Sequence, residues 1–273
     1  MDLGIMGRVA VIGGGSKGLG RACANSLAKE GSNLVICSRN SDDLNQAAKE
    51  INSATGVDVL PVAADLTRLS DIQAVIERVV NHFGRLDILV NNSGGPPAGR
   101  STDITEEVWY QSLDMALLFF IRMSRESIPY MKQGKWGRIV NVLASSVYQP
   151  IDNLVTSGVT RMGAVAFAKS LSDEVGRHNI LVNNVAPGYL LTDRMMHIFE
   201  TRSNETGVDV EQLLNEHAAT IPVGRLGRPE ELGDLVAFLA SDKNTYTTGA
   251  TILVDGGVAV SYTHLTLPTN REV

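Results

Sequence analysis

The chain alternates between short apolar runs and longer segments in which apolar residues recur every three or four positions. Seven apolar runs rich in β-branched residues stand out, namely "RVAVIG" at 8, "NLVICS" at 33, "VDVLPV" at 57, "LDILVN" at 86, "GRIVNVL" at 137, "ILVNNV" at 180 and "ATILVDGG" at 250. Apolar strands that alternate with helices are typical of a parallel sheet covered on both faces. We therefore predict one doubly wound α/β domain with a seven-stranded parallel sheet.

Two segments interrupt this alternation. Residues 192–222 lie between the sixth apolar run and a helix expected to open at Pro229. Insertions at the carboxyl end of a parallel strand commonly cover a binding site, so we predict that residues 192–222 form a lid. The last stretch, "SYTHLTLPTNREV" from Ser261, has no periodicity and resembles read-through of cloning DNA. We place the domain at residues 1–260 and expect residues 261–273 to be a disordered tail.

A helix expected near residues 105–132 contains the run "LLFFI" at 117–121. Five consecutive apolar residues place hydrophobic side chains on every face of a helix, so two faces must be covered. One face can pack on the sheet, and a second subunit would cover the other. The run therefore indicates a homodimer or homotetramer, with a loop over the second face as the alternative.

Composition excludes several classes of partner. The 273 residues include 24 basic and 30 acidic residues, for a net charge of -6, which gives no basic surface for nucleic acid or anionic membrane. No apolar run approaches the length of a membrane span and no leader peptide is evident, so we expect a cytoplasmic protein. Cys23 and Cys37 fall in an expected helix and strand, and we interpret them as reduced core residues. No pattern of metal ligands is present, and we predict no metal site.

The first candidate site is the glycine-rich segment "VAVIGGGSKGLG" at residues 9–20. Glycines between a strand and a helix let the backbone approach a pyrophosphate, which the amide groups at the helix N-terminus can then receive. This predicts a dinucleotide site at Gly14, Ser16, Lys17, Gly18 and Leu19. The same residues spell the G-x-S-x-G pattern of a hydrolase around Ser16, but no earlier strand and loop could supply its oxyanion donor.

The end of the second strand indicates which dinucleotide is bound. A site for NAD needs a carboxylate at this turn, whereas the chain has Ser38 and Arg39 there. Arg39 and Lys17 would instead hold a 2′-phosphate, so the sequence favours NADP(H). Asp42 or Asp43 would restore a site for NAD only if the turn were displaced.

These motifs resemble the short-chain dehydrogenase/reductase family over residues 6–257. The resemblance rests on "GGGSKGLG", "ADL" at 64–66, "NNSG" at 91–94, "PG" at 187–188 with a following threonine, "GRPEEL" and "DGG". It implies a Rossmann-type fold and oxidation or reduction of a carbonyl/alcohol pair with a nicotinamide cofactor. It also implies that the adenine is contacted by Asp65 and Leu66 and the rest of the cofactor by Asn92, Gly94, Pro187, Gly188 and Thr192.

The catalytic positions depart from the family pattern. An ungapped comparison places Ala116, Ala144, Ser157 and Arg161 where the family carries asparagine, serine, tyrosine and lysine. In the family the tyrosine donates a proton, and its pKa is lowered by the lysine ammonium. Serine is a far weaker acid and too short to take this role. Arg161 could still bind the nicotinamide ribose, or it could instead form a structural ion pair. Ser145 could supply the missing serine from one residue away.

Two functions remain open. In the first, the chain is an NADP(H)-dependent oxidoreductase whose proton donor has moved, with Tyr148, on the loop after the fifth strand, as the candidate acid. An apolar group in the lid, "MMHIF" at 195–199, favours this reading if it lines a substrate pocket, although it could equally anchor the lid. In the second, the chain binds NADP(H) without catalysis, as a sensor or as one subunit of an oligomer.

Overall fold

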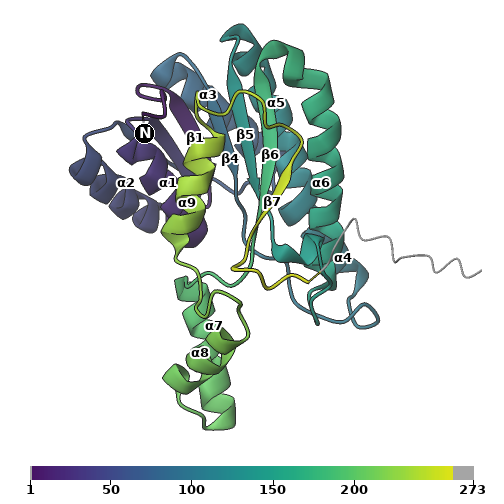
Figure 1. Ribbon diagram of the computed structural model, residues 1–273. Helices are drawn as coiled ribbons and strands as arrows, with labels where there is room; N and C mark the ends of the chain where they lie inside the picture. Colours follow the sequence, from purple (N-terminus) through teal and green to yellow (C-terminus); the bar gives the residue numbers. More distant parts are fainter. Residues whose placement is uncertain (1, 261–273) are drawn as a thin grey trace, which may run out of the picture.

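The computed structural model describes residues 2–260 and contains one α/β domain built on a seven-stranded parallel sheet (Figure 1). The strands are ordered β3-β2-β1-β4-β5-β6-β7, which confirms the predicted fold class. The predicted tail at residues 261–273 lies outside the described residues.

The seven strands coincide with the seven apolar runs of the sequence. They are β1 (Val9–Gly13), β2 (Asn33–Ser38), β3 (Val59–Ala63), β4 (Ile88–Asn91), β5 (Gly137–Val142), β6 (Ile180–Pro187) and β7 (Thr251–Val254). In register, Val11 pairs with Val35 of β2 on one side and with Leu89 of β4 on the other. The direction of the strand order reverses between β1 and β4. Such a switch point leaves a crevice at the carboxyl ends of the two strands, where ligands bind in open α/β sheets.

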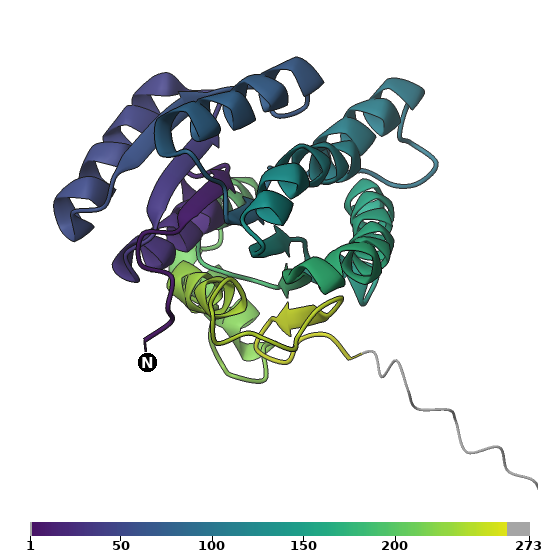
Figure 2. The same ribbon diagram turned by 90° about the horizontal axis from the view of Figure 1, so that it is seen from above.

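Helices cover both faces of the sheet (Figure 2). They are α1 (Gly18–Lys29), α2 (Ser41–Thr55), α3 (Leu69–Phe83), α4 (Glu106–Leu113), α5 (Phe119–Gln133), α6 (Val155–Val175), α7 (Asp193–Thr206), α8 (Val210–Ala219) and α9 (Pro229–Leu239). One buried cluster joins the sheet to α1, α2 and α9, and a second joins it to α3, α5 and α6. Successive strand residues point to opposite faces, so a strand such as β1 is apolar at every position because each face meets helices.

Three buried asparagines link neighbouring strands near the crevice. The Asn91 amide donates to Asn141 at 2.9 Å, and the Asn141 amide donates to Asn184 at 2.8 Å. The Asn184 amide then donates to the Thr251 hydroxyl at 3.0 Å. Buried amides are tolerated when they are paired in this way, and this chain of bonds connects β4, β5, β6 and β7.

The helix expected near residues 105–132 is present as α4 and α5, joined by one π-helical turn at Asp114–Leu118. Phe119 and Phe120 are 1% and 0% exposed within the single chain, whereas Leu118 and Ile121 are half-buried. The aromatic pair is therefore covered without a second subunit. The "LLFFI" run is thus weaker support for an oligomer than its composition indicated.

Cys23 and Cys37 are both buried and free, and burial raises the pKa of each thiol to about 12. A thiol with so high a pKa is a poor nucleophile at neutral pH, in keeping with a core role. Over residues 2–260, no helix has the length and apolar character that a membrane crossing requires.

Candidate functional site

Two neighbouring cavities lie at the carboxyl ends of the strands, and both are lined by Gly14, Asn92, Ser93 and Gly94. The smaller cavity, of about 180 Å³, is completed by Cys37, Ser38, Arg39, Ala64, Asp65, Leu66, Thr67, Met115 and Phe119. The larger cavity, of about 520 Å³, is completed by Lys17, Gly18, Leu19, Gly95, Pro96, Val142, Leu143, Ala144, Leu154, Ser157, Arg161, Pro187, Gly188, Thr192, Asp193 and Arg194. All the predicted cofactor residues except Ser16 line one of these two cavities.

The glycine-rich loop folds as its residue types require. Gly14 has a φ of +61°, a left-handed conformation that glycine adopts without steric cost. A Cβ at Gly20 would collide with the Gly14 carbonyl oxygen, so the third glycine lets the start of α1 pack against the loop. The Asn92 amide donates to the Gly13 carbonyl at 3.0 Å and fixes the loop to the end of β4. The first-turn amides of α1 have no intrahelical acceptors, which leaves them able to bind an anion.

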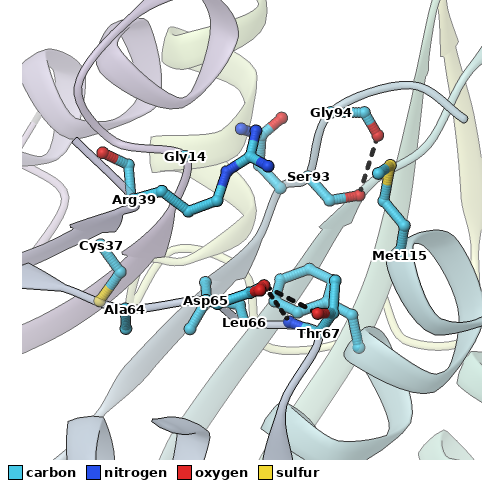
Figure 3. Close-up of a pocket in the computed structure, with 13 residues that line it drawn as sticks. Gly14, Cys37, Arg39, Ala64, Asp65, Leu66, Thr67, Ser93, Gly94 and Met115 are labelled. Atoms are coloured by element: carbon cyan, nitrogen blue, oxygen red, sulfur yellow. Dashed lines mark hydrogen bonds between the residues drawn. The ribbon is translucent and has the colours of Figure 1, made fainter. Parts of the chain in front are cut away.

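The smaller cavity combines a carboxylate with a guanidinium. The Thr67 hydroxyl donates to Asp65 at 2.8 Å, and this hydrogen bond is the main reason why the pKa of the Asp65 carboxyl lies below its ordinary value. Arg39 adds to the lowering of this pKa. In Figure 3, the Arg39 side chain extends from the end of β2 across the cavity toward Ser93, while Asp65 lies on the opposite side.

Lys17 and Arg39, the two residues predicted to hold a 2′-phosphate, line different cavities. The Lys17 ammonium lies 2.8 Å from the carboxylate of Asp43 in the first turn of α2. Ser16 does not line either cavity, but its hydroxyl donates to the Ser38 hydroxyl at 3.2 Å. Ser16 therefore links the glycine-rich loop to the end of β2, while Lys17 already has an acidic partner.

The larger cavity brings Ser157 and Arg161 together on α6, as their four-residue spacing predicts. The Ser157 hydroxyl lies 3.4 Å from the hydroxyl of Ser146, in the short 3₁₀ turn Ser145–Val147. One amino group of the Arg161 guanidinium donates to the Val142 carbonyl at 2.9 Å, at the end of β5. Ala144 also lines this cavity, so the two positions where the family carries serine and tyrosine share one wall.

Arg161 is a buried cation. Arg161 is only 5% exposed, and its Nε has no hydrogen-bond partner among the residues that the structure describes. Burial, and secondly the neighbouring charge of Arg194, lowers the pKa of Arg161 to about 10. The guanidinium therefore stays protonated at neutral pH.

The structure does not bring Tyr148 or Ser145 to the larger cavity. The Tyr148 hydroxyl donates to the Thr251 carbonyl at the start of β7, and burial raises the pKa of this phenol above its ordinary value. Ser145 lines a separate hollow with Gln149, Pro150 and Tyr189. The geometry thus gives no support to Tyr148 as the displaced acid or to Ser145 as the replacement serine.

The predicted lid segment consists largely of two helices, α7 and α8, which extend beyond the ends of the strands (Figure 1). Its first residues, Thr192 to Arg194, line the larger cavity. The apolar residues of "MMHIF" line neither cavity; Phe199 instead packs edge-on against His217 of α8, which also packs against Tyr189. For Phe199, anchoring of the lid is therefore the better interpretation.

The sequence interpretation missed Arg194, which lines the larger cavity, and Ser146, which contacts the cavity residue Ser157. Arg194 sits in the first turn of α7, where its guanidinium approaches Gly95. Arg194 could have been predicted from the sequence, because it lies two residues after Thr192, which was itself predicted to contact the cofactor. Ser146 had no such signal, because only its contact with Ser157 distinguishes it from the adjacent Ser145.

The paired cavities fit an extended dinucleotide. A Cβ added at Gly94 would meet no atom within 4 Å, so space stays open beside this glycine, which lines both cavities. The smaller cavity offers Asp65 and Arg39, whereas the larger cavity offers the first turn of α1 and, further along, Thr192. Polar groups suited to a nucleoside and to phosphates thus lie in two neighbouring cavities.

Comparison with known proteins agrees with this geometry. A family model described as Enoyl-(Acyl carrier protein) reductase matches residues 14–259. The 3-oxoacyl-[acyl-carrier-protein] reductase FabG of Aquifex aeolicus is 33% identical over 94% of this chain and 100% of its own. The short chain dehydrogenase/reductase astE of Aspergillus oryzae is 31% identical over 94% of this chain and 96% of its own.

Solved structures agree as well. The L-sorbose reductase of Gluconobacter frateurii, complexed with NADPH and L-sorbose, superposes with a TM-score of 0.93 at 34% identity, covering 96% of this chain and 100% of that one. YwfH, an NADPH-dependent reductase involved in bacilysin biosynthesis, gives a TM-score of 0.89 at 29% identity, covering 94% and 100%. On these matches and the site's geometry, the chain belongs to the short-chain dehydrogenase/reductase family.

Proposed function

We propose that the protein is an NADP(H)-dependent oxidoreductase that interconverts a carbonyl and an alcohol and uses a non-standard proton donor. The observation that carries this proposal is that the two cavities are neighbours that share the lining residues Gly14, Asn92 and Gly94. The smaller cavity is suited to the adenosine end of the cofactor, and the larger one has room for the nicotinamide end and a small substrate. The relatives named above include an L-sorbose reductase complexed with NADPH.

The residues of the chain would divide the cofactor between them. Asp65 and Leu66 would contact the adenine, and Arg39 with Lys17 would hold the 2′-phosphate, for which Lys17 must exchange its partner Asp43. The amides at the start of α1 would receive the pyrophosphate. Gly94, Pro187, Gly188 and Thr192 would border the nicotinamide end. When bound, NADPH supplies the hydride that reduces a carbonyl carbon.

A proton must reach the carbonyl oxygen from another source. Serine hydroxyls both donate and accept hydrogen bonds, and Ser157 lies 3.4 Å from Ser146 at the wall of the larger cavity. We infer that a water molecule held by Ser157 in this cavity relays a proton from bulk solvent to the carbonyl oxygen as the hydride arrives, so that no hydroxide is left in the cavity. This role predicts that Ser157→Ala lowers kcat more than it changes KM.

One observation favours the second function, binding of NADP(H) without catalysis. Over residues 2–260, no tyrosine, histidine or cysteine lines the larger cavity. The tyrosine that donates the proton in the family, and histidine, the most frequent proton donor of enzymes, are therefore missing beside the expected nicotinamide position. Such a protein would sense the cofactor or serve as an inert subunit.

Oxidation of NADPH by a panel of ketones and aldehydes separates these two functions. If the protein is an enzyme, NADPH absorbance should decrease in the presence of at least one carbonyl compound of the panel. Ser157→Ala should slow this reaction, whereas Ser170→Ala should not, because Ser170 is on the same helix but lines neither cavity. NADPH binding without oxidation across the panel would instead support the binding protein.

Assembly and location remain predictions. Tyr110 of α4 and Val159 and Met162 of α6, two helices in contact, are 61%, 52% and 48% exposed. Exposed apolar side chains on adjacent helices support our proposal of a homo-oligomer. Light scattering of the purified protein tests this, with Met162→Glu expected to reduce the measured mass. We also propose a cytoplasmic location, on the sequence argument given above.

A further inference from the structure

The larger cavity contains two arginines without acidic partners. Over residues 2–260, neither Arg161 nor Arg194 forms an ion pair. Asp193 is the one acidic residue that lines this cavity, and no bond joins it to either guanidinium. The cavity therefore carries a net positive charge that the chain itself leaves unneutralised.

Of the two arginines, Arg161 gives the stronger evidence for an anionic ligand. Burying a charge is unfavourable unless it is paired, yet Arg161 is 5% exposed and its one recorded hydrogen bond goes to a neutral carbonyl. Its Nε has no partner in the described part of the chain. The nearby Arg194 increases this imbalance, because like charges repel. A buried guanidinium of this kind fits an anionic ligand.

The cofactor does not account for this charge. Its pyrophosphate belongs at the glycine-rich loop, which follows β1, whereas Arg161 is bonded to the end of β5. Since β4 lies between those strands, the two positions are about 10 Å apart across the sheet. A hydroxyl of the nicotinamide ribose could accept one hydrogen bond from Arg161, but the ribose hydroxyls are neutral. A contact with the ribose would therefore leave the positive charge of Arg161 without a counter-charge, which an anionic group of the substrate would supply.

We propose that Arg161 and Arg194 bind the carboxylate of an acidic substrate, a 2-oxo acid or a related carbonyl acid. This inference rests on the proposed function and specifies its substrate class. Guanidinium groups match the planar shape of carboxylates and bind them through paired hydrogen bonds. Arg161 forms the buried end of the site, and Arg194, from the exposed first turn of α7, covers it from the lid segment.

Calorimetry on the complex with NADP⁺ tests this site without turnover, because the oxidised cofactor has no hydride to give. The two probes are benzoylformate and methyl benzoylformate, which share a ketone and differ in the negative charge. The acid should bind at least tenfold more tightly than the ester. Arg161→Met should remove this preference and Arg194→Met should weaken it, while Arg161→Lys should keep part of it.

Arg202→Met is the matched control, since Arg202 is an exposed arginine of α7 that does not line the cavity. It should leave the preference for the acid unchanged. Because Arg194 is exposed, its variant should fold even if the buried Arg161→Met does not.

Three results would overturn the inference: equal binding of acid and ester, a preference that survives both Arg→Met variants, or displacement of NADP⁺ by benzoylformate. NADP⁺ binding without a preference for the acid would overturn this inference alone. Absence of NADP⁺ binding would overturn the proposed function and this inference with it.

Discussion

The Lys17 ammonium lies 2.8 Å from the Asp43 carboxylate, which joins the glycine-rich loop to the first turn of α2. This ion pair lies beside the end of β2, where a 2′-phosphate is expected. In the proposed complex, Asp43 would therefore compete with the phosphate for Lys17 and would also repel it.

Asp43→Asn should strengthen NADPH binding about threefold, the size expected when an exposed ion pair is released. Fluorescence titration with NADPH provides the measurement. Asp42→Asn is the control, because it removes the same charge from the same helical turn where no ion pair is formed. Unchanged or weaker NADPH binding in Asp43→Asn would contradict a phosphate position at Lys17.

Lys17→Ala and Arg39→Ala should each weaken NADPH binding about tenfold, since a hydrogen bond to a charged group contributes about 1.5 kcal/mol. NADH affinity should change little, because NADH lacks the 2′-phosphate. Arg68→Ala, which removes an exposed arginine near Asp65 that lines neither cavity, serves as the control. Equal losses for both cofactors would assign these side chains to another part of the nucleotide.

The triple variant Ala144→Ser, Ser157→Tyr and Arg161→Lys should increase NADPH-dependent carbonyl reduction about 100-fold, as a positioned general acid can. Ser157 lines the larger cavity, so a tyrosine there can project into open space, and lysine at 161 would lower its pKa. The single variant Arg161→Lys should show no such increase. A folded triple variant that binds NADPH but gains no activity would show that the missing tyrosine is not what limits the reaction.

The fold could be predicted because its signal is repeated along the chain. The strands are mostly apolar, and all seven apolar runs became strands. The grouping of the proposed cofactor residues was also predictable, since they follow strand ends, which meet at one edge of a parallel sheet. Tyr148 could not be placed in this way: its hydroxyl is bonded to Thr251, 103 residues away, and no local pattern encodes that contact. Likewise, the burial of Phe119 and Phe120 depends on which helices surround α5.

Acid should remove one stabilising contact at the start of α9. Glu231 accepts hydrogen bonds from the Arg225 guanidinium, at 2.6 Å and 2.9 Å, and from the Arg228 amide at 2.7 Å. These bonds, led by that from Arg225, lower the pKa of Glu231 from 4.5 to about 2. Because the folded pKa is the lower one, the stabilisation is complete above the unfolded pKa and disappears as the pH falls toward the folded pKa.

Glu231→Gln should therefore lower the free energy of unfolding at neutral pH by about 1 kcal/mol, as for loss of a capping interaction. The full pKa shift would imply more, but solvent screens this partly exposed group. Urea titrations should show that the difference from the unsubstituted protein shrinks as the pH falls from about 4.5 to about 2. Glu230→Gln is the control. A difference independent of pH would rule out the ionised carboxylate as its source.

The most direct test of the NADP(H) site, on which the proposed function rests, is titration of the purified protein with NADPH and, separately, with NADH, followed by the fluorescence of the dihydronicotinamide. The account predicts NADPH binding at least tenfold tighter than NADH binding, through Arg39 and Lys17. Equal affinities, or no binding of either cofactor, would contradict it.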